Sequence, residues 1–343
     1  MRTFQFLRSL LESAALSMLR LTLFLLPRRG VFLLGRTVGW FMFHVLRLKR
    51  GITLSNLEQA FGTAYSPKQL KRIASRCFLH FGAVFAEFLV LPRLSGSDLD
   101  ACFELENPEV LDDALGKGRG ILITAGHLGN WELLGGVLAR RGYPFTIYVG
   151  RQRNLKADAL VNWIRWRMGI GTVPKGWGAM RSMLRVLKDN QVLGMLSDQH
   201  FSRNRHFVRF FGHLISAAPG LGSLSNRLKP ELVFAETYQV APFQYRTRFF
   251  PFQLSTPSGS EEYDLLDVTQ KFMDLLEAAV RRHPEQYFWM HRSWRQPPAQ
   301  SALSPVNREF LAGRPPPETP PSGPGSKPGP EPGPEPEPGS DGR

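Results

Sequence analysis

The sequence predicts an α/β fold with a mainly parallel central sheet flanked by helices on both faces, preceded by an N-terminal membrane-associated helical segment. From Gly118 onward, short apolar runs typical of buried strands alternate with segments of helical periodicity. This alternation favours parallel pairing, because each crossover helix returns the chain to the same edge of the sheet. The first fifty residues instead combine strong apolarity with nine arginines and lysines, a pattern typical of a membrane-associated segment.

The N-terminal segment divides into two apolar, helix-prone stretches, 4–26 and 31–48, separated by a Pro-Arg-Arg-Gly break. Arg20 interrupts the first stretch and Arg36 the second, so neither contains 18 consecutive uncharged apolar residues. We expect the first to insert into the membrane or lie deep in its interface, and the second to lie against the bilayer or the body. No cleavage site for a signal peptide follows, and the basic flanks favour a body on the cytoplasmic side.

A capping box at Ser66, with proline at the first helical position, predicts a helix that runs to about Leu91. Its apolar and aromatic residues suit a core position, and Glu87 is the exception among them. The strands that we expect further along are 120–125, 144–149, 192–197, 207–211 and 231–238. The helices that we expect between and after them are 131–141, 156–168, 178–188, one that begins at Pro219 with Ser216 as a cap, and 264–282.

Composition divides the chain into three parts. We predict membrane-associated helices over 1–50, one catalytic domain over 51–300 and a disordered Pro/Gly-rich tail over 301–343. Beyond Gly313 the last thirty residues hold 12 of the 27 prolines, in a run typical of disordered or polyproline-like chain.

Charge indicates the class of partner. The chain has a formal charge of +14, and because 314–343 is net acidic the folded body carries about +16. Such a surface suits an anionic partner, and without a recognisable nucleic-acid motif we expect anionic lipid or an acidic carrier protein rather than nucleic acid. Cys77 and Cys102 form no disulfide framework and are most simply buried thiols in a reducing compartment, although one disulfide stays open. No histidine has metal-ligand spacing, so we predict neither metal nor cofactor.

The strongest candidate for chemistry is His127, with Glu132 five residues later. The spacing alone is weak, since about 0.7 such matches are expected by chance from 8 histidines and 29 acidic residues. The context is stronger: an apolar run ends at Ala125, a helical pattern begins at Trp131, and glycines flank His127. His127 is therefore predicted on a strand-to-helix turn at the carboxyl edge of the sheet, where open α/β sheets place their sites.

This arrangement suits acyl transfer to a hydroxyl, with His127 as general base and Glu132 orienting the imidazole. An acid–base pair of this kind typically contributes about 10²–10⁴-fold in rate. Backbone N–H groups at the start of the helix could face developing negative charge. The alternative is structural: His127 caps the helix and Glu132 is a solvated acid in its first turn.

Two further polar residues follow predicted strands. Arg151 comes after 144–149 and Asp198 after 192–197, so both would meet His127 at one edge of the sheet. Arg151 could bind a phosphate or an acyl carbonyl, and Asp198 could fix Arg151 or the acceptor. The structural alternative for each is a surface ion pair. Near the end of the chain, His291 and Arg292 follow four bulky residues and could line an acyl channel or a headgroup site, or belong to an edge strand.

These residues resemble a known family. Gly-His-Leu-Gly-Asn-Trp-Glu at 126–132 is similar to the signature of the bacterial lipid A biosynthesis (lauroyl/myristoyl) acyltransferases, whose wider family includes phosphatidylinositol mannoside acyltransferases. Further blocks follow in the family's order over about 35–300: Asn56-Leu57 with Phe61, Arg151 with Asn154, Asp198-Gln199, Phe210-Phe211-Gly212, Pro284-Glu285-Gln286-Tyr287 and His291-Arg292. Gln152 stands where the family has proline after the arginine, which leaves Arg153 as an alternative to Arg151.

The resemblance implies an enzyme of the bacterial inner membrane with its catalytic body on the cytoplasmic side. It implies transfer of a fatty acyl chain from acyl carrier protein, or from acyl-CoA, to a hydroxyl of a lipid A precursor or related glycolipid, without a metal. By position, His127 and Glu132 become the catalytic pair. The supporting or substrate-binding residues become Arg151, Asp198, Asn130 and Gln199.

Two other functions stay open at this point. The same pair could activate water and hydrolyse a lipid ester or thioester, since the absence of a Gly-x-Ser-x-Gly elbow argues only against the serine route. Alternatively, the chain could be a basic lipid-binding protein without catalysis, which would not need His127, Glu132 and Asp198 to converge.

Overall fold

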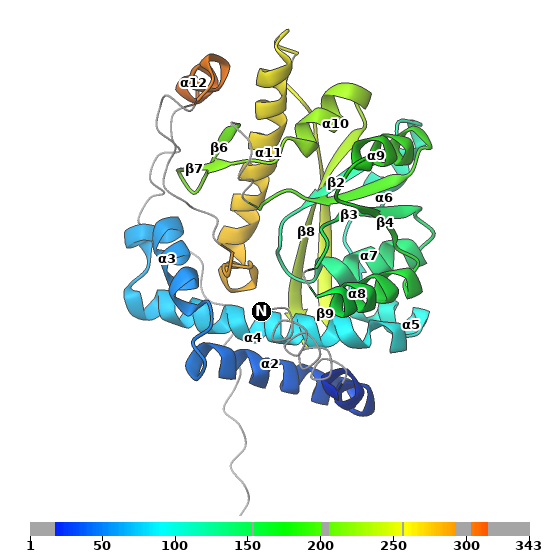
Figure 1. Cartoon of the computed structure of the whole chain (residues 1–343), viewed down its shortest axis with the longest axis vertical. Coiled ribbons are helices and arrows are strands. Elements are labelled where there is room, and N and C mark those ends of the chain that lie inside the picture. The colour runs from blue at the N-terminus through cyan, green and yellow to red at the C-terminus, as the bar shows by residue number, and fades with distance from the viewer. Residues whose placement is uncertain (1–17, 153, 200–205, 256, 292–302, 315–343) are drawn as a thin grey trace, which may run out of the picture.

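The fold is an α/β layered structure built on a seven-stranded mixed sheet (Figure 1). A computed structural model describes residues 18–152, 154–199, 206–255, 257–291 and 303–314. The strands lie in the order β1 (Phe103–Leu105), β9 (Gln244–Phe252), β8 (Glu231–Ala241), β2 (Ile121–Ala125), β5 (Val192–Leu196), β3 (Phe145–Val149) and β4 (Gly171–Pro174). Within this seven-stranded sheet, as far as the described residues show, only β8 and β9 pair antiparallel, so the prediction of a mainly parallel sheet is confirmed.

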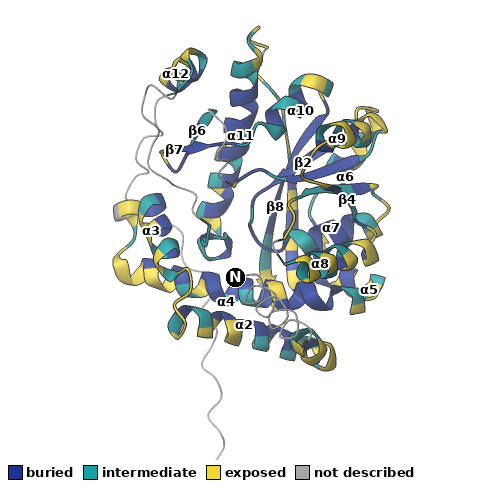
Figure 2. Ribbon diagram, viewed as in Figure 1, coloured by how far each residue is buried: buried dark blue, intermediate teal, exposed yellow. Residues whose placement is uncertain are grey.

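Helices cover both faces of this sheet. On one face, buried residues of α9 (Ala179–Lys188), α10 (Gly220–Leu228) and α11 (Glu261–Arg282) pack with Leu122 of β2. On the other, α5 (Gly96–Cys102), α6 (Glu109–Gly116), α7 (Trp131–Arg140) and α8 (Leu155–Arg167) pack with Ile121 and Ile123. Successive side chains of a strand point to opposite faces, so each buried strand contributes to both cores. Figure 2 shows β2 and much of β8 buried at the centre of the fold.

Several elements differ from the prediction. The short strands β1 and β4, and the hairpin strands β6 (Phe207–Phe210) and β7 (His213–Ser216), leave too few residues for a period to be recognised, and only β6 is predicted. β9 is missed for another reason. It mostly alternates buried apolar and exposed polar residues, as an antiparallel strand with one solvated face does, so it lacks the continuous apolar run by which the other strands are predicted.

The segment before the sheet is helical and packs on the body. Residues 18–25 are helical, followed by α2 (Arg28–His44), α3 (Arg50–Phe61) and α4 (Pro67–Val90). α4 begins at the predicted capping box of Ser66. By length and composition the stretch Pro67–Arg93 could cross a membrane, but 67% of its most apolar window is buried in the fold, so this is weak evidence of a span.

Glycines bring α2 and α4 into close contact at one end of the molecule (bottom of Figure 1). A Cβ at Gly35 or Gly39 would overlap the backbone of α4, and one at Gly82 would overlap the backbone of α2. The buried face of α2 therefore packs against the body. This agrees with one of the two positions expected for 31–48, which were the bilayer and the body. Because of this packing, and because Arg50 begins α3, residues 28–50 are continuous with the body rather than a separate unit.

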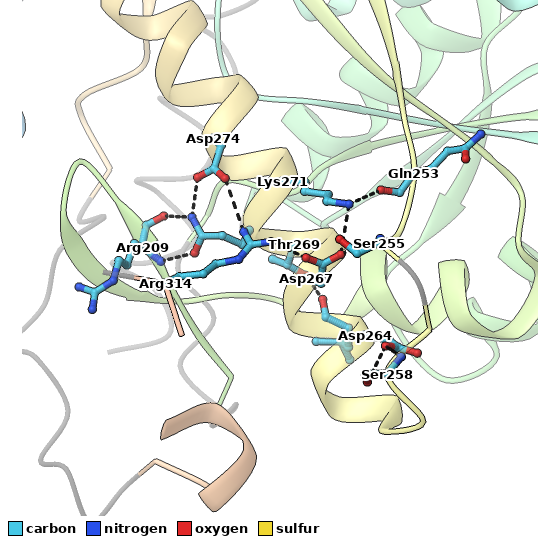
Figure 3. A network of polar contacts seen from close by, with 12 residues as sticks. Arg209, Gln253, Ser255, Ser258, Asp264, Asp267, Thr269, Lys271, Asp274 and Arg314 are labelled. Atoms are coloured by element: carbon cyan, nitrogen blue, oxygen red, sulfur yellow. Dashed lines mark hydrogen bonds and ion pairs between the residues drawn. The ribbon is translucent and has the colours of Figure 1, made fainter. Parts of the chain in front are cut away.

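The prediction that 301–343 is disordered is wrong for its first part, which contains a helix. Ser304 caps α12 (Pro305–Ala312), in which Phe310 is fully buried, and Arg314 beyond it pairs with Asp267 of α11 at 2.5 Å (Figure 3). A serine cap, a proline at the first helical position and a following glycine are a complete helix signal that the composition of the tail obscured. Residues 315–343 lie outside the described part of the chain. Cys77 and Cys102 are both buried and free, as predicted.

Candidate active site

The turn between β2 and α7 carries His127, as the sequence predicts. Gly129 has φ +62°, and a Cβ there would overlap the carbonyl oxygen of Thr237 on β8, so only glycine fits. Asn130 caps α7 by accepting a hydrogen bond from the N–H of Leu133 at 3.1 Å. The turn is thereby fixed at its glycine and at its cap, which determines the direction in which His127 projects.

His127 is held by Asp198, which follows β5 on the neighbouring strand. Nδ1 of His127 lies 2.7 Å from Oδ1 of Asp198, and the backbone N–H of His127 donates to Oδ2 at 2.8 Å. Asp198 is 4% exposed. Since an ionised carboxylate only accepts, Nδ1 carries a proton and Nε2 carries the lone pair when the ring is neutral.

The electrostatics of the pair follow from this contact. Burial opposes ionisation of Asp198, but the charge of His127 and the two hydrogen bonds from it outweigh burial and hold the pKa of Asp198 below its ordinary value. Asp198 is therefore an anion beside the imidazole at neutral pH. Sequence reasoning placed Asp198 at this edge but expected it to fix Arg151 or the acceptor.

The contact expected from Glu132 is made by Asp198 instead, and this corrects the predicted geometry. Glu132 lies in the first turn of α7, but its carboxylate pairs with Arg165 of α8, whose Nε donates at 3.1 Å and whose Nη2 makes a second contact. The physical reason is topology: the ends of β2 and β5 are adjacent, so Asp198 reaches Nδ1. The sequence offers no signal for Arg165, because it lies within a helix with no recognisable motif.

Gln199 and His291 lie on the outer side of the His127 ring. The side-chain amide nitrogen of Gln199 lies 3.1 Å from Nε2 of His127 and 3.0 Å from Nε2 of His291. An amide N–H₂ has two hydrogens, so Gln199 can donate to both rings. Burial, followed by the charge of His127, lowers the pKa of His291 to about 4, which keeps its ring neutral.

The chain after α11 also contacts the turn that carries His127. The N–H of Phe288 donates to the carbonyl of His127 at 2.9 Å, and the N–H of Gly129 donates to the carbonyl of Gln286 at 3.0 Å. Asn56 of α3 holds the next turn, donating to the carbonyl oxygens of Trp289 at 2.7 Å and His291 at 2.5 Å. Asn56 and His291 belong to the blocks that resemble the family, but only the fold brings them to His127.

Aromatic rings form the apolar wall beside His127. Trp131 packs against the imidazole with its ring centroid at 4.8 Å, and Phe81 of α4 lies edge to face with Phe288 at 4.8 Å. Phe288 also packs edge to face against His291. These rings present apolar surface to the imidazole, while its Nε2 is contacted by the polar amide of Gln199.

Arg151 is exposed after β3, and no hydrogen bond or ion pair of its side chain is present among the described residues. Arg153, the alternative, lies outside the described residues, as does Arg292. Asn154 caps α8 by accepting from the N–H groups of Lys156 and Ala157. The structure therefore brings together His127, Asp198 and Gln199, with Glu132 and Asn130 on the same helix start, and it leaves Arg151 exposed after β3. No group of three or more metal-ligating side chains occurs within the described ranges.

Comparison with known proteins identifies the family of the chain. The model of the bacterial lipid A biosynthesis acyltransferases matches residues 2–296. The chain belongs to this family. The lipid A biosynthesis palmitoleoyltransferase of Escherichia coli (strain K12) is 23% identical over 285 residues, 81% of this chain and 89% of the relative. A phosphatidylinositol mannoside acyltransferase of Mycolicibacterium smegmatis is 23% identical over 290 residues, 76% of this chain and 90% of the relative.

As a member of the lipid A biosynthesis acyltransferase family, the chain is an acyltransferase. The predicted family and enzyme class are thus confirmed, as is the expectation of a membrane-lipid type of substrate at the level of the family. The family match reaches back to residue 2, so it includes the apolar N-terminal segment together with the site.

Proposed function

We propose that this acyltransferase moves a fatty acyl chain from an acyl thioester, on acyl carrier protein or coenzyme A, to a hydroxyl of a lipid A precursor or related glycolipid. The observation that carries the proposal is the His127–Asp198 contact, which gives Nε2 a lone pair directed away from the buried carboxylate. An oriented, neutral imidazole is the group that acyl transfer to a hydroxyl needs as its base.

The proposed reaction begins when the acceptor hydroxyl replaces the amide of Gln199 at Nε2. Nε2 takes the hydroxyl proton as the oxygen attacks the thioester carbonyl, and a tetrahedral intermediate forms. As the intermediate collapses, the carbon–sulfur bond breaks and the sulfur takes the proton from the imidazolium, which yields an ester and a free thiol. Asp198 stabilises the imidazolium in between, as a buried carboxylate does in other acyl-transfer sites.

Two groups are candidates for the oxyanion of the intermediate. The backbone N–H groups of Trp131 and Glu132 lie at the N-terminus of α7, where helix N–H groups have no partner within the helix. Arg151, exposed after β3, is the second candidate. Glu132 remains in the proposed catalytic set as a second carboxylate close in sequence to the imidazole, with its charge balanced by Arg165.

Membrane attachment is the second part of the proposal. The face of α2 turned away from α4 exposes large apolar side chains, among them Leu33, Trp40 and Phe41. Further exposed apolar residues precede and follow α2, and they are Met18, Leu21, Leu25, Val45, Leu46 and Leu48. Basic residues are interspersed with them, which suits an interface with anionic lipid. We propose the bacterial inner membrane, with the catalytic body on its cytoplasmic side.

The test is acyl transfer by the purified full chain in mixed micelles. Acyl carrier protein and coenzyme A thioesters serve as donors, and a lipid A precursor and a phosphatidylinositol mannoside as acceptors, with products identified by mass spectrometry. We expect esterified glycolipid with wild-type protein and none with His127→Ala that remains folded. Release of free fatty acid at the same rate with and without acceptor would instead show a hydrolase. Wild-type turnover by His127→Ala would remove the proposed base.

A further inference from the structure

Glu87 is a buried carboxyl group that the proposed reaction does not use. It is 1% exposed and lies on α4, among buried residues that are mostly apolar. Its Oε2 accepts two hydrogen bonds, from the amide N–H₂ of Asn130 at 3.0 Å and from the hydroxyl of Tyr245 at 2.5 Å. Its Oε1 is buried and has no hydrogen-bond partner among the described residues. Burial of a carboxyl group in such a place costs folding free energy, so its two hydrogen bonds need an explanation.

Asn130 is the residue through which Glu87 reaches the site. The oxygen of the Asn130 amide caps α7 at the N–H of Leu133, so its N–H₂ must face α4. Asn130 is fully buried, which leaves no water to take those hydrogens. The acceptor on Glu87 therefore fixes the orientation in which Asn130 caps the helix.

The position of this cap determines where the reacting groups lie. Asn130 is three residues after His127 and two before Glu132, at the point where the turn enters α7. On the other side the turn is held by Gln286 and Phe288 through backbone hydrogen bonds. The turn that carries His127 is thus clamped between the chain after α11 and the Glu87–Asn130 contact.

We propose that Glu87 is a positioning residue, which holds the catalytic turn in register by orienting the amide of Asn130. Its kinetic consequence rests on the proposed acyl transfer, whereas its structural consequence does not. A displacement of about 1 Å at a reacting group can reduce the rate about 100-fold, which is the scale of effect that a lost clamp would have.

Three single variants separate positioning from general stability. Glu87→Leu removes the acceptor, Glu87→Gln keeps an amide oxygen that can accept both bonds, and Tyr245→Phe removes the other donor while leaving Asn130 bonded. We expect Glu87→Leu to lower kcat about 100-fold with little change in KM, because binding groups outside the turn are untouched. Glu87→Gln and Tyr245→Phe should stay within about threefold of wild type.

An exchange of donor and acceptor tests the contact itself. Asn130→Asp alone keeps the cap oxygen but replaces the donating N–H₂ with a second carboxyl group, so the contact then needs one of the two groups to be protonated; at pH 8 it should lower kcat at least about tenfold. In Glu87→Gln combined with Asn130→Asp, the glutamine N–H₂ donates to the aspartate, so the hydrogen bond is restored with reversed polarity. We expect the double variant to recover most of the activity that Asn130→Asp loses.

Hydrogen–deuterium exchange of the peptide covering 126–134 gives a readout without activity. Glu87→Leu should speed exchange in this peptide, whereas Tyr245→Phe should not. Wild-type kcat and exchange in Glu87→Leu, equal losses in Tyr245→Phe, or a double variant no better than Asn130→Asp would each overturn the proposal. If wild-type protein shows no acyl transfer, the proposed function fails, and the exchange measurement still decides the role of Glu87.

Discussion

Asp198 binds His127 twice, once at the ring Nδ1 and once at the backbone N–H, so a single carboxylate fixes both the rotation of the imidazole and the position of the turn that carries it. An asparagine at 198 would keep the size but present only one oxygen, and it would leave either the ring or the backbone N–H without an acceptor. We therefore expect Asp198→Asn to lower kcat about 10²–10⁴-fold in the acyl-transfer assay, with KM little changed.

The matched control is Ser197→Ala at the preceding buried residue, whose hydroxyl accepts from Thr124 and does not contact His127. It should retain activity within about threefold. Equal losses in both variants would show that Asp198 acts only through the stability of the end of β5.

Variants of the Glu132–Arg165 ion pair can separate a role of Glu132 in stability from a role in the reaction. Arg165→Met leaves a largely buried carboxylate without its partner, and we expect the free energy of unfolding to fall by about 3 kcal/mol. Adding Glu132→Gln removes that uncompensated charge and should restore most of the stability in urea denaturation. If Glu132 takes part in the reaction, the double variant stays inactive although it is stable. A stable and fully active double variant would assign Glu132 a structural role only.

Gly129 and Gly142 test how tightly the catalytic turn is confined, since both have positive φ but only Gly129 is in contact with other backbone. Alanine at either position costs about 1–2 kcal/mol for its backbone conformation. At Gly142 nothing lies within 4 Å of the added Cβ, whereas at Gly129 it overlaps the carbonyl of Thr237. We expect Gly142→Ala to keep activity with a slightly lower Tm and Gly129→Ala to lose it. Similar behaviour of the two would show that the turn tolerates displacement.

The pH dependence of stability reports the burial of Glu87. Burial raises the pKa of Glu87 from its ordinary 4.5 to about 7, against the effect of its two hydrogen bonds. Below pH 4.5 Glu87 is protonated in both the folded and the unfolded chain, and its contribution to the free energy of unfolding is complete. As the pH rises toward 7 this contribution is lost, because Glu87 ionises first in the unfolded chain. Relative to Glu87→Gln, wild-type protein should lose about 2–3 kcal/mol of unfolding free energy between pH 5 and pH 8.

Urea denaturation of both variants at the two pH values measures this difference. His80 and His291, whose pKa values burial lowers to about 4, act in the opposite direction as the pH falls from 6.5, but they are common to both variants and cancel. Parallel pH profiles for wild type and Glu87→Gln would contradict the raised pKa.

Trp40 is the natural probe for the proposed membrane face, because the residue is 48% exposed on the side of α2 away from the body. With vesicles that contain anionic lipid and bromine-labelled acyl chains, we expect a large part of the tryptophan quenching to disappear in Trp40→Phe. Trp177→Phe, in the exposed loop before α9, is the matched control and should leave the quenching unchanged. Unchanged quenching in Trp40→Phe would place the membrane contact elsewhere.

The fold was predictable where the local pattern and the tertiary environment agree. The buried strand before His127, the glycines around it and the capped helix after it each have a short-range cause, and so does the helix that begins at Ser66. β9 and α12 were missed because one is polar on its outer face and the other lies next to a proline-rich composition that suggests disorder.

By itself, the sequence determined that this protein is an α/β acyltransferase of a recognisable family and that His127 stands on a strand-to-helix turn. Only the tertiary structure decided that Asp198 rather than Glu132 holds the imidazole, that Arg165 balances Glu132, and that Glu87 orients the cap of the turn. The reason is that these contacts join residues 33 to 71 positions apart, and the order of β2 and β5 in the sheet and the packing of α4 and α8 bring them together. The spacing of residues along the chain does not indicate which strands and helices become neighbours in the fold.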